Sequence, residues 1–333
     1  MVAQQERTAL PLLTTSRLKT ARRCAREHDL RYNQGITSAE DAAALRIGTG
    51  VHLVLEAWWQ AERDVRLQSA LDALASYEWA DEYERVRAEA LIVGYHTRWD
   101  DASDAYDVLG VEAQFRAPLK NPETGGTSRT WELAGKIDVI VRERATGRVL
   151  VVEHKTTSED CSPGSDYLKR LVLDGQVSMY FVGAETVVGA PVDGCLYDVI
   201  RKPGLRPYKA TPEDQRKYTK AGALYANQRA EDETPDEFRA RLFEAIAEDP
   251  VKYYARAEVV RLDGEVGEAL FDVWQTARAM RDNELRGFHP RNPDACVRYG
   301  RTCEFWPVCA GQASIDDEHL YRRLDDVHPE LSR

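Results

Sequence analysis

The sequence predicts a mixed α/β fold in which a central sheet is flanked by helices. Three observations support this prediction: helical periodicity before residue 100, strand-like patterns between residues 108 and 155, and further helical periodicity after residue 201. This order is typical of a sheet whose faces are covered by helices. The 333 residues contain no internal repeat and no low-complexity linker. We therefore expect one domain over residues 1–333, with a core at about 100–200, an N-terminal helical part at 1–100 and a C-terminal helical part at 201–333.

The N-terminal part is expected to contain three helices. A short basic helix should carry Cys24, and a longer helix is predicted over residues 38–60 with Ser38 as its N-cap. The longer helix contains His52. Another helical pattern runs from about residue 81 to residue 99.

The rest of the chain alternates between strand-like and helical patterns. Turn-rich segments separate the first three strands, one with Asn-Pro and Gly-Gly pairs and one around Gly147. The expected strands are residues 108–119, 130–142, 148–155, 194–201 and 253–262, and the expected helices are residues 165–182, 211–230, 234–248 and a long one from Asp263.

The composition is that of a globular protein with an acidic balance. Hydrophobic residues make up 43% of the chain, and the formal net charge is −11. No apolar run is long enough for a membrane span, and the N-terminus lacks a secretory signal, so we expect a cytoplasmic protein with no membrane partner.

The net charge argues only weakly against nucleic-acid binding, because local basic patches bind phosphates. Basic stretches occur at residues 17–26, 169–170 and 201–209, and each fits a solvated surface equally well.

A carboxylate and an ammonium group share one face of the strand predicted at residues 148–155. Side chains alternate faces along a strand, so Glu153 and Lys155 point the same way. Asp138 lies in the preceding strand, and the short turn at Gly147 allows the two strands to pair antiparallel. Asp138 and Glu153 can then converge on one divalent cation, and their hard oxygen ligands suit Mg²⁺ or Mn²⁺.

Such a site has the parts that phosphodiester hydrolysis needs. A metal polarises the scissile phosphate and lowers the pKa of a bound water, and Lys155 can orient that water or stabilise the developing charge. The pattern is short, however. An ordinary salt bridge, in which Lys155 neutralises Glu153, fits the same residues.

Motifs on both sides of this pair extend the pattern. Residues 135–138 read Gly-Lys-Ile-Asp, residues 153–157 Glu-His-Lys-Thr-Thr, residues 48–52 Gly-Thr-Gly-Val-His and residues 176–180 Gln-Val-Ser-Met-Tyr. Together they resemble the PD-(D/E)XK nucleases, and within them the RecB-like branch, whose motifs are G-x-x-D, [D/E]-x-K-T, G-x-x-x-H and Q-x-x-x-Y. The resemblance covers roughly two-fifths of the chain and implies a restriction-endonuclease-like core.

The resemblance also implies roles for single residues. The implied metal ligands are His52, Asp138, Glu153 and the backbone carbonyl of His154. The residues implied in catalysis are Asp138, Glu153, Lys155, Gln176, Tyr180 and Glu112. Gln176 and Tyr180 would position the DNA backbone, and Glu112 resembles the first acidic residue of the family. Taken alone, His52 fits a helix histidine satisfied by Glu56, and Gln176 and Tyr180 fit ordinary packing.

Four of the six cysteines have a spacing that suggests a metal centre. Cys296, Cys303 and Cys309 form a C-x6-C-x5-C run, and Cys24 lies near the other end of the chain. Zinc sites usually contain closely spaced cysteine pairs, and thiolates also hold iron–sulfur clusters. The layout resembles that of RecB-like members, including phage exonucleases, that bind a [4Fe–4S] cluster, which here would be a structural staple between the chain ends. Zinc and unligated thiols remain alternatives.

The resemblance therefore predicts an Mg²⁺-dependent exonuclease of the phage recombination and repair type, acting on the ends of duplex or single-stranded DNA. A recombinase or a single-strand annealing protein is a candidate partner. The alternatives are a CRISPR-adaptation-like end-trimming nuclease, an endonuclease, and a catalytically silent DNA-binding subunit. The intact Asp138, Glu153 and Lys155 argue against the silent subunit. No G-x-x-x-x-G-K-[ST] loop occurs, so no use of ATP is expected.

Overall fold

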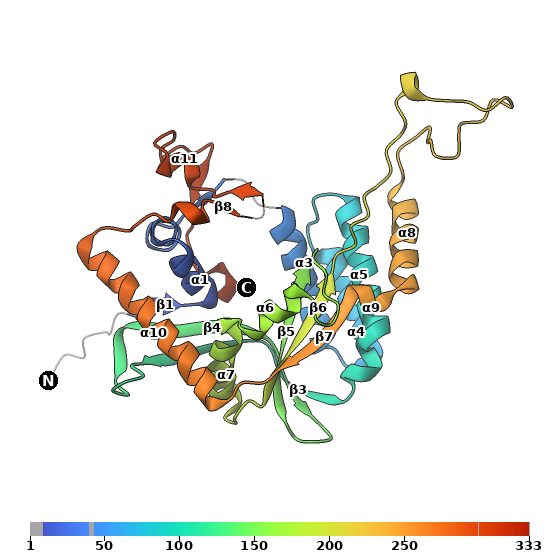
Figure 1. The fold of residues 1–333 in the computed structure, drawn as a ribbon. Coiled ribbons are helices and arrows are strands. Elements are labelled where there is room, and N and C mark those ends of the chain that lie inside the picture. The colour runs from blue at the N-terminus through green and yellow to red at the C-terminus, as the bar shows by residue number, and fades with distance from the viewer. Residues whose placement is uncertain (1–8, 40–42, 299, 333) are drawn as a thin grey trace.

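The centre of the fold is a six-stranded mixed sheet. The computed structural model describes residues 9–39, 43–298 and 300–332. The strand order is β1-β4-β5-β6-β7, and β3 also pairs with β4. The strands are β1 (Leu12–Leu13), β3 (Tyr106–Lys120), β4 (Thr127–Glu143), β5 (Val149–Thr157), β6 (Gly194–Arg201) and β7 (Tyr254–Val259). The predicted α/β class, with a central sheet flanked by helices, is confirmed (Figure 1).

Strand β5 leaves its neighbour β4 part of the way along the sheet. The two strands pair antiparallel from Arg142–Val149 to Val139–Val152, and no further. Beyond that point β1 pairs with β4 instead, at Glu132 and Leu133. On its other side β5 pairs with β6 in parallel along its whole length. The sheet therefore opens into a fork between β4 and β5.

Helices cover both faces of the sheet (Figure 1). One face is covered by α3 (Ala43–Gln60), α4 (Arg66–Ser76), α5 (Glu82–Ser103) and α8 (Pro235–Glu248), and the other by α1 (Thr15–Arg23), α7 (Gly175–Val188) and α10 (Asp263–Arg286). The shorter helices are α2 (Ala25–His28), α6 (Asp166–Val172), α9 (Pro250–Tyr253) and α11 (Trp306–Cys309). Among the described helices, none combines the length and the apolar character that a membrane crossing requires.

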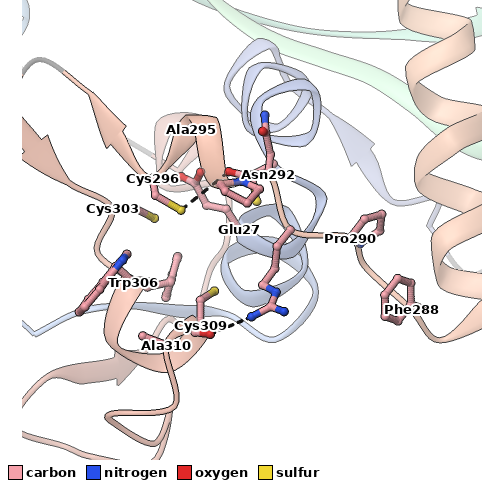
Figure 2. Close-up of a pocket in the computed structure, with 14 residues that line it drawn as sticks. Glu27, Phe288, Pro290, Asn292, Ala295, Cys296, Cys303, Trp306, Cys309 and Ala310 are labelled. Atoms are coloured by element: carbon pink, nitrogen blue, oxygen red, sulfur yellow. Dashed lines mark hydrogen bonds between the residues drawn. The ribbon is translucent and has the colours of Figure 1, made fainter.

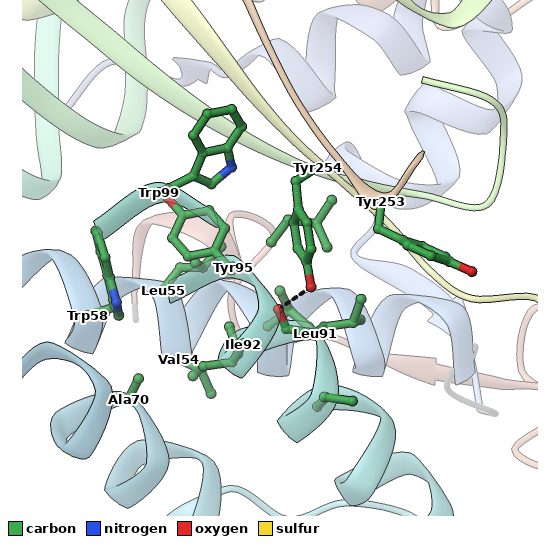
Figure 3. Close-up of a cluster of buried hydrophobic side chains, with 14 of the residues drawn as sticks. Val54, Leu55, Trp58, Ala70, Leu91, Ile92, Tyr95, Trp99, Tyr253 and Tyr254 are labelled. Carbon is green, nitrogen blue, oxygen red and sulfur yellow. Dashed lines mark hydrogen bonds between the residues drawn. The ribbon is translucent and has the colours of Figure 1, made fainter. Parts of the chain in front are cut away.

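The core on the α5 side is rich in aromatic side chains (Figure 3). The rings of Trp58 and Tyr95 pack edge to face with their centroids 5.2 Å apart. The hydroxyl of Tyr254 donates to the carbonyl of Leu91 at 2.8 Å. A Cβ at Gly94 would collide with Tyr254, so glycine allows β7 to lie against α5. This packing fixes α3 and α5 to the sheet.

On the opposite face the ring of Phe115 lies between two glycines. A Cβ at Gly135 of β4 would come within 2.6 Å of this ring, and a Cβ at Gly183 of α7 within 2.5 Å. Both contacts are closer than real Cβ atoms allow. The two glycines therefore let α7 lie directly over β3 and β4, next to the fork.

Two predicted boundaries are wrong. The helix expected at residues 165–182 is split into α6 and α7, because Asp174 caps a new helix by accepting from the backbone N–H of Gln176. Ser38 is not a described helix cap but the last residue of β2 (Ile36–Ser38). It pairs with β10 (Tyr321–Arg323), a partner that local sequence patterns cannot reveal.

The helix predicted at residues 211–230 is also wrong. Residues 202–233, named the arm from here on, instead form a long projection from the end of β6 (Figure 1). The arm contains one short 3₁₀ turn, Glu213–Gln215, and one β-bridge between Tyr218 and Leu224. None of residues 211–230 is buried. Helices gain most of their stability from packing an apolar face, and this segment packs none.

Segments near the two ends of the sequence, residues 24–38 and the tail from Pro290, come together beside α2. The tail contains the hairpin of β8 (Val297–Arg298) and β9 (Arg301–Thr302), followed by α11. The backbone N–H of Arg26 donates to the carbonyl of Pro290 at 3.1 Å, and Arg31 pairs with Glu304 at 2.7 Å. Residues far apart in the sequence thus share one small core around Phe305.

Candidate active site

Two carboxylates meet at the fork between β4 and β5. The predicted antiparallel pairing of these strands is confirmed. Asp138 and Glu153 are the next residues beyond its last pair, Val139–Val152, on β4 and β5 respectively. The backbone N–H of His154 donates to Asp138 Oδ2 at 2.7 Å. Asp138 is 9% exposed and Glu153 only 2%. The sheet therefore holds two carboxylates close together and almost out of water.

Lys155 and two side chains of α7 surround Glu153. The ammonium of Lys155 donates to Glu153 Oε1, and to Gln176 Oε1 at 3.0 Å. The amide of Gln176 donates to Glu153 Oε1 at 2.7 Å and to the hydroxyl of Tyr180 at 2.6 Å. Tyr180 in turn donates to the carbonyl of Lys136 at 2.9 Å. One network thus fixes the side chains that the sequence motifs grouped.

Helix α3 brings His52 to the other side of Asp138. The distance from His52 Nδ1 to Asp138 Oδ2 is 3.8 Å. Burial, and next the charge of Lys155, lower the pKa of His52 to about 4. A Cβ at Gly48, one turn earlier, would lie 3.4 Å from Thr156 Oγ1, so α3 passes close to the end of β5. The imidazole is therefore neutral near pH 7, and a ring nitrogen can act as a ligand.

Glu112 lies opposite Asp138 on the neighbouring strand β3. It falls between two registered pairs of the β3–β4 ladder and forms an ion pair with Lys136. Among the described residues other than glycine, only Glu112 has a positive φ, at 49°. Such a conformation costs about 1–3 kcal/mol in a residue with a Cβ. Strained residues of this kind often belong to functional sites.

The electrostatics of the fork favour a bound cation. Burial, and next the charges of Glu153 and Glu112, raise the pKa of Asp138 well above its usual range. The second oxygen of Glu153, Oε2, is buried and has no hydrogen-bond partner. A divalent cation would relieve both the repulsion and the missing partner, and oxygen donors beside a neutral imidazole fit Mg²⁺ or Mn²⁺. Within the described chain, no set of three or more His, Cys, Asp or Glu side chains stands in a ready-made ligand arrangement.

A buried polar network behind β5 was not foreseen from the sequence. The side chain of His154 points to the face opposite Glu153, with Nδ1 3.6 Å from Asp198 Oδ2. Tyr95 donates to that oxygen at 2.5 Å and Arg256 at 3.1 Å. Burial lowers the pKa of His154 to about 3, so its ring stays neutral. The one available signal was a single aspartate inside the otherwise apolar strand β6.

The residues that the motifs grouped lie together. Around the fork lie His52, Glu112, Asp138, Glu153, His154, Lys155, Gln176 and Tyr180. Their arrangement provides carboxylates for a metal, a lysine beside them, and an amide and a hydroxyl on one helix face.

A second candidate site lies at the meeting point of the chain ends. Cys24, Cys296, Cys303 and Cys309 line one cavity of about 510 Å³ (Figure 2). All four are free thiols, and burial raises the pKa of Cys303 to about 11. The other two cysteines are buried in the core on the α7 side. The structure thus gathers the same four cysteines that their spacing grouped.

A family model and solved structures match the chain. The family model described as the PD-(D/E)XK nuclease superfamily matches residues 12–310. A solved structure from Eubacterium rectale, named "Putative exonuclease", has 11% sequence identity and a TM-score of 0.48, over 91% of this chain and 88% of that chain. The crystal structure of SSO0001 has 12% identity and a TM-score of 0.35, over 94% of this chain and 90% of that one. These two likenesses are too distant to carry an argument. No curated protein matches the chain in sequence.

Proposed function

The chain belongs to the PD-(D/E)XK nuclease superfamily, and from this premise we propose that it is a metal-dependent exonuclease that hydrolyses DNA from its ends. The observation that carries the proposal is the buried fork where Asp138 and Glu153 meet Lys155. His52 and the Gln176–Tyr180 pair at the same fork favour the RecB-like branch.

The proposed metal ligands are His52, Asp138, Glu153 and the backbone carbonyl of His154. The unpartnered Oε2 of Glu153 and the neutral ring of His52 support this set. A bound Mg²⁺ or Mn²⁺ would polarise the scissile phosphate and lower the pKa of a water. A bound cation would offset the repulsion between the carboxylates of Asp138 and Glu153 and so lower the raised pKa of Asp138. Metal binding would therefore release a proton from this pair.

Lys155 and the side chains of α7 would act on the substrate directly. Although burial opposes it, the Glu153 carboxylate raises the pKa of Lys155 above its usual value, so the ammonium stays charged. A charged Lys155 can hold the attacking water or balance charge on a phosphate oxygen, and it cannot act as a general base. Gln176 and Tyr180 would orient the DNA backbone, since their amide and hydroxyl already form one hydrogen-bonded row beside Glu153.

We also propose that the cysteine cavity holds a [4Fe–4S] cluster. Four free thiols line the same volume, and aromatic and proline side chains make up much of the remaining wall. Thiolates are the usual ligands of such clusters. A reducing compartment such as the cytoplasm would keep the thiols available. Zinc remains the alternative occupant, and a metal analysis of the purified protein separates the two.

The test of the function compares linear and covalently closed circular DNA of one sequence, each with Mg²⁺ and with EDTA. The proposed exonuclease should degrade end-labelled linear DNA only with Mg²⁺ and leave the circle intact. Cleavage of the circle would identify an endonuclease. Removal of only a few terminal nucleotides would favour a CRISPR-adaptation-like trimming enzyme. Binding without cleavage of either DNA would identify a catalytically silent subunit.

A role in phage-type recombination and repair would add a protein partner. A recombinase or a single-strand annealing protein is the candidate, because such proteins use the strand that an exonuclease exposes. Neither ATP nor a membrane is part of the proposal.

A further inference from the structure

The arm is an anchored projection that takes no part in the site described above. At its root, Arg87 of α5 donates to the carbonyl of Leu205 and Arg241 of α8 to the carbonyl of Arg206, each at 3.0 Å. Further out, its two limbs bond to each other, with the N–H of Thr211 donating to the carbonyl of Arg229 at 2.9 Å. The arm extends beyond α8, away from the body of the molecule (Figure 1).

The arm leaves the sheet at the edge that carries the acid–lysine fork. Strands β5 and β6 are parallel, so their carboxyl ends lie at the same edge. The backbone N–H of Lys202, the first residue of the arm, donates to the carbonyl of Thr157 at 2.7 Å. Thr157 is only two residues beyond Lys155 along β5. A ligand that runs along the arm is therefore directed toward the fork.

The outer part of the arm is positively charged. Residues 215–230 contain four basic residues and no acidic residue, in a chain whose net charge is −11. Nearer the root the charges are matched, since Lys209 pairs with Asp232 at 2.8 Å. At the tip, Lys217 and Lys220 are exposed, and the structure records no ion pair for either within the described chain. The positive charge that has no acidic partner in the arm is therefore concentrated at the tip.

Two tyrosines accompany these lysines. Tyr218 is 56% exposed and Tyr225 is 45% exposed. The arm's bridge between Tyr218 and Leu224 and the bond from the N–H of Tyr225 to the carbonyl of Lys217 keep both tyrosines at the tip. Exposed aromatic rings beside lysines are the usual parts of a surface that binds single-stranded nucleic acid, because bases stack on the rings and phosphates meet the cations.

We propose that the tip of the arm is a second DNA-binding site, which holds a single-stranded segment of the DNA whose end lies at the fork. The position of the DNA end at the fork rests on the proposed nuclease function. The contact between the DNA and the tip rests on the residues of the arm. Lys217 and Lys220 contact phosphates, and Tyr218 and Tyr225 stack on unpaired bases. The arm thus adds affinity for long strands at a distance from the scissile bond.

The length of the arm sets the length of DNA that can use it. The limb from Lys202 to Tyr218 contains 17 residues and, fully extended, spans at most about 55 Å. A stacked strand rises about 3.4 Å for each nucleotide, so roughly 16 stacked nucleotides cover the whole of this distance, and fewer suffice when the strand is unstacked. A strand of this length or longer can therefore contact the fork and the tip at once, whereas a strand of only a few nucleotides can contact one of them at a time.

The test measures binding of fluorescein-labelled oligo(dT) of about 4 and about 40 nucleotides, in EDTA so that no cleavage occurs, with lengths chosen well below and well above the estimated reach. The full chain is compared with Lys217→Ala/Lys220→Ala and with Tyr218→Ala/Tyr225→Ala. Arg281→Ala/Arg286→Ala on α10, at the opposite side of the molecule, is a control with the same charge change (Figure 1). Melting temperatures verify that each variant is folded.

Both arm variants should bind the long strand about tenfold more weakly and lose most of the advantage of the long strand over the short one. The lysine variant should also lower the salt dependence of binding by about 1.4 in slope, since each phosphate contact on a single strand contributes about 0.7. Tyr218→Phe/Tyr225→Phe should bind like the unmodified chain, because phenylalanine keeps the stacking surface.

Unchanged binding in both arm variants, or an equal loss in the α10 control, would overturn the proposal. So would normal DNA binding combined with the loss of a protein partner. The outcome is separate from that of the nuclease proposal. An inactive protein whose DNA binding depends on the arm would refute only the nuclease, and an active enzyme whose DNA binding ignores the arm would refute only the second site.

Discussion

The acid–lysine fork and the cysteine cavity are assembled in different ways. The fork takes its carboxylates, lysine and amide from β4, β5 and α7, which follow one another within residues 127–188, and these side chains hydrogen-bond to each other. The cavity takes Cys24 from one end of the chain and three cysteines from the other, and their thiols line a volume of about 510 Å³. The fork is therefore positioned by neighbouring elements of one sheet and one helix, whereas the cavity is lined by segments from opposite ends of the sequence.

Substitutions at the fork and at the cavity should therefore have different effects on activity and stability. A change at the fork should remove activity and leave the fold almost intact, because the sheet and α7 hold their places without it. A change at the cavity should loosen the fold first and reduce activity only as a consequence.

The largest effect is expected from Glu153→Gln. Cleavage of end-labelled linear DNA at saturating Mg²⁺ should fall by about 10³-fold or more, since the variant would neutralise a proposed metal ligand at the site where the transition state is stabilised. The melting temperature should stay close to that of the unmodified chain, because glutamine has nearly the same size. Glu123→Gln in the exposed β3–β4 turn is the matched control and should keep full activity. A folded Glu153→Gln protein with an unchanged rate would contradict the assignment of the site.

Cys24→Ala tests the other side of the contrast. A link between Cys24 and the tail closes a loop of about 270 residues, and by analogy with a disulfide its loss should cost about 4–5 kcal/mol of unfolding free energy. The anaerobically purified chain should be brown and contain iron and acid-labile sulfide, and the variant should lose both.

Cys161→Ala, at a buried cysteine outside the cavity, should keep the colour. Zinc without iron in the unmodified chain would refute the cluster but not the link. Unchanged metal content and stability in Cys24→Ala would refute the link itself.

A smaller effect is expected from His52→Gln. The Mg²⁺ concentration needed for half-maximal cleavage should rise by about tenfold to a hundredfold, since one ligand is lost from a site that keeps its carboxylates. The melting temperature should change little. His96→Gln on α5 is the control, since His96 accepts from Trp58 and faces no carboxylate of the fork. Lower stability with an unchanged need for metal would make His52 an ordinary structural histidine.

The smallest effect concerns acid stability of the terminal region. Burial, and next the charge of Arg17, lower the pKa of His28 to about 3, and Arg17 donates to its ring at 3.0 Å. The unfolded chain takes up this proton near pH 6.5, so the contribution of His28 is complete above that pH and is lost as the pH falls toward 3. At pH 5 the loss is about 2 kcal/mol.

Urea unfolding at pH 7 and pH 5 measures this loss. His28→Gln can still accept from Arg17 and should show a smaller difference between the two pH values. An equal difference in the variant and the unmodified chain would exclude His28 as its source.

The fork could be foreseen from the sequence because its causes are local. Strand alternation placed Glu153 and Lys155 on one face, and the turn at Gly147 made β4 and β5 neighbours. The network of His154, Asp198 and Arg256 could not be foreseen, because it joins the back of β5 to two strands that follow much later in the chain. Which face of a strand meets which helix is set by the packing of the whole sheet.

In the arm, by contrast, the sequence predicts an element that the structure does not contain. Residues 211–230 are rich in alanine, lysine and glutamine, which favour helices, yet the predicted helix does not form. Gly222, with a φ of 80°, and Pro212 interrupt the segment. More importantly, none of residues 211–230 is buried against the described parts of the chain, and an isolated helix of this length is marginal in water.

The pairing of β2 with β10 also determines when the molecule can be completed during its synthesis. Ser38 leaves the ribosome 283 residues before its partner Tyr321. At about 5–20 residues per second, the N-terminal segment waits on the order of tens of seconds for that partner. During this interval Cys24 lacks the three cysteines of the tail, so the proposed cluster, which would use all four, could be inserted only after the tail has emerged. The yield of intact protein should then depend on the supply of iron relative to the rate of translation, and slower expression in iron-replete cells should increase it.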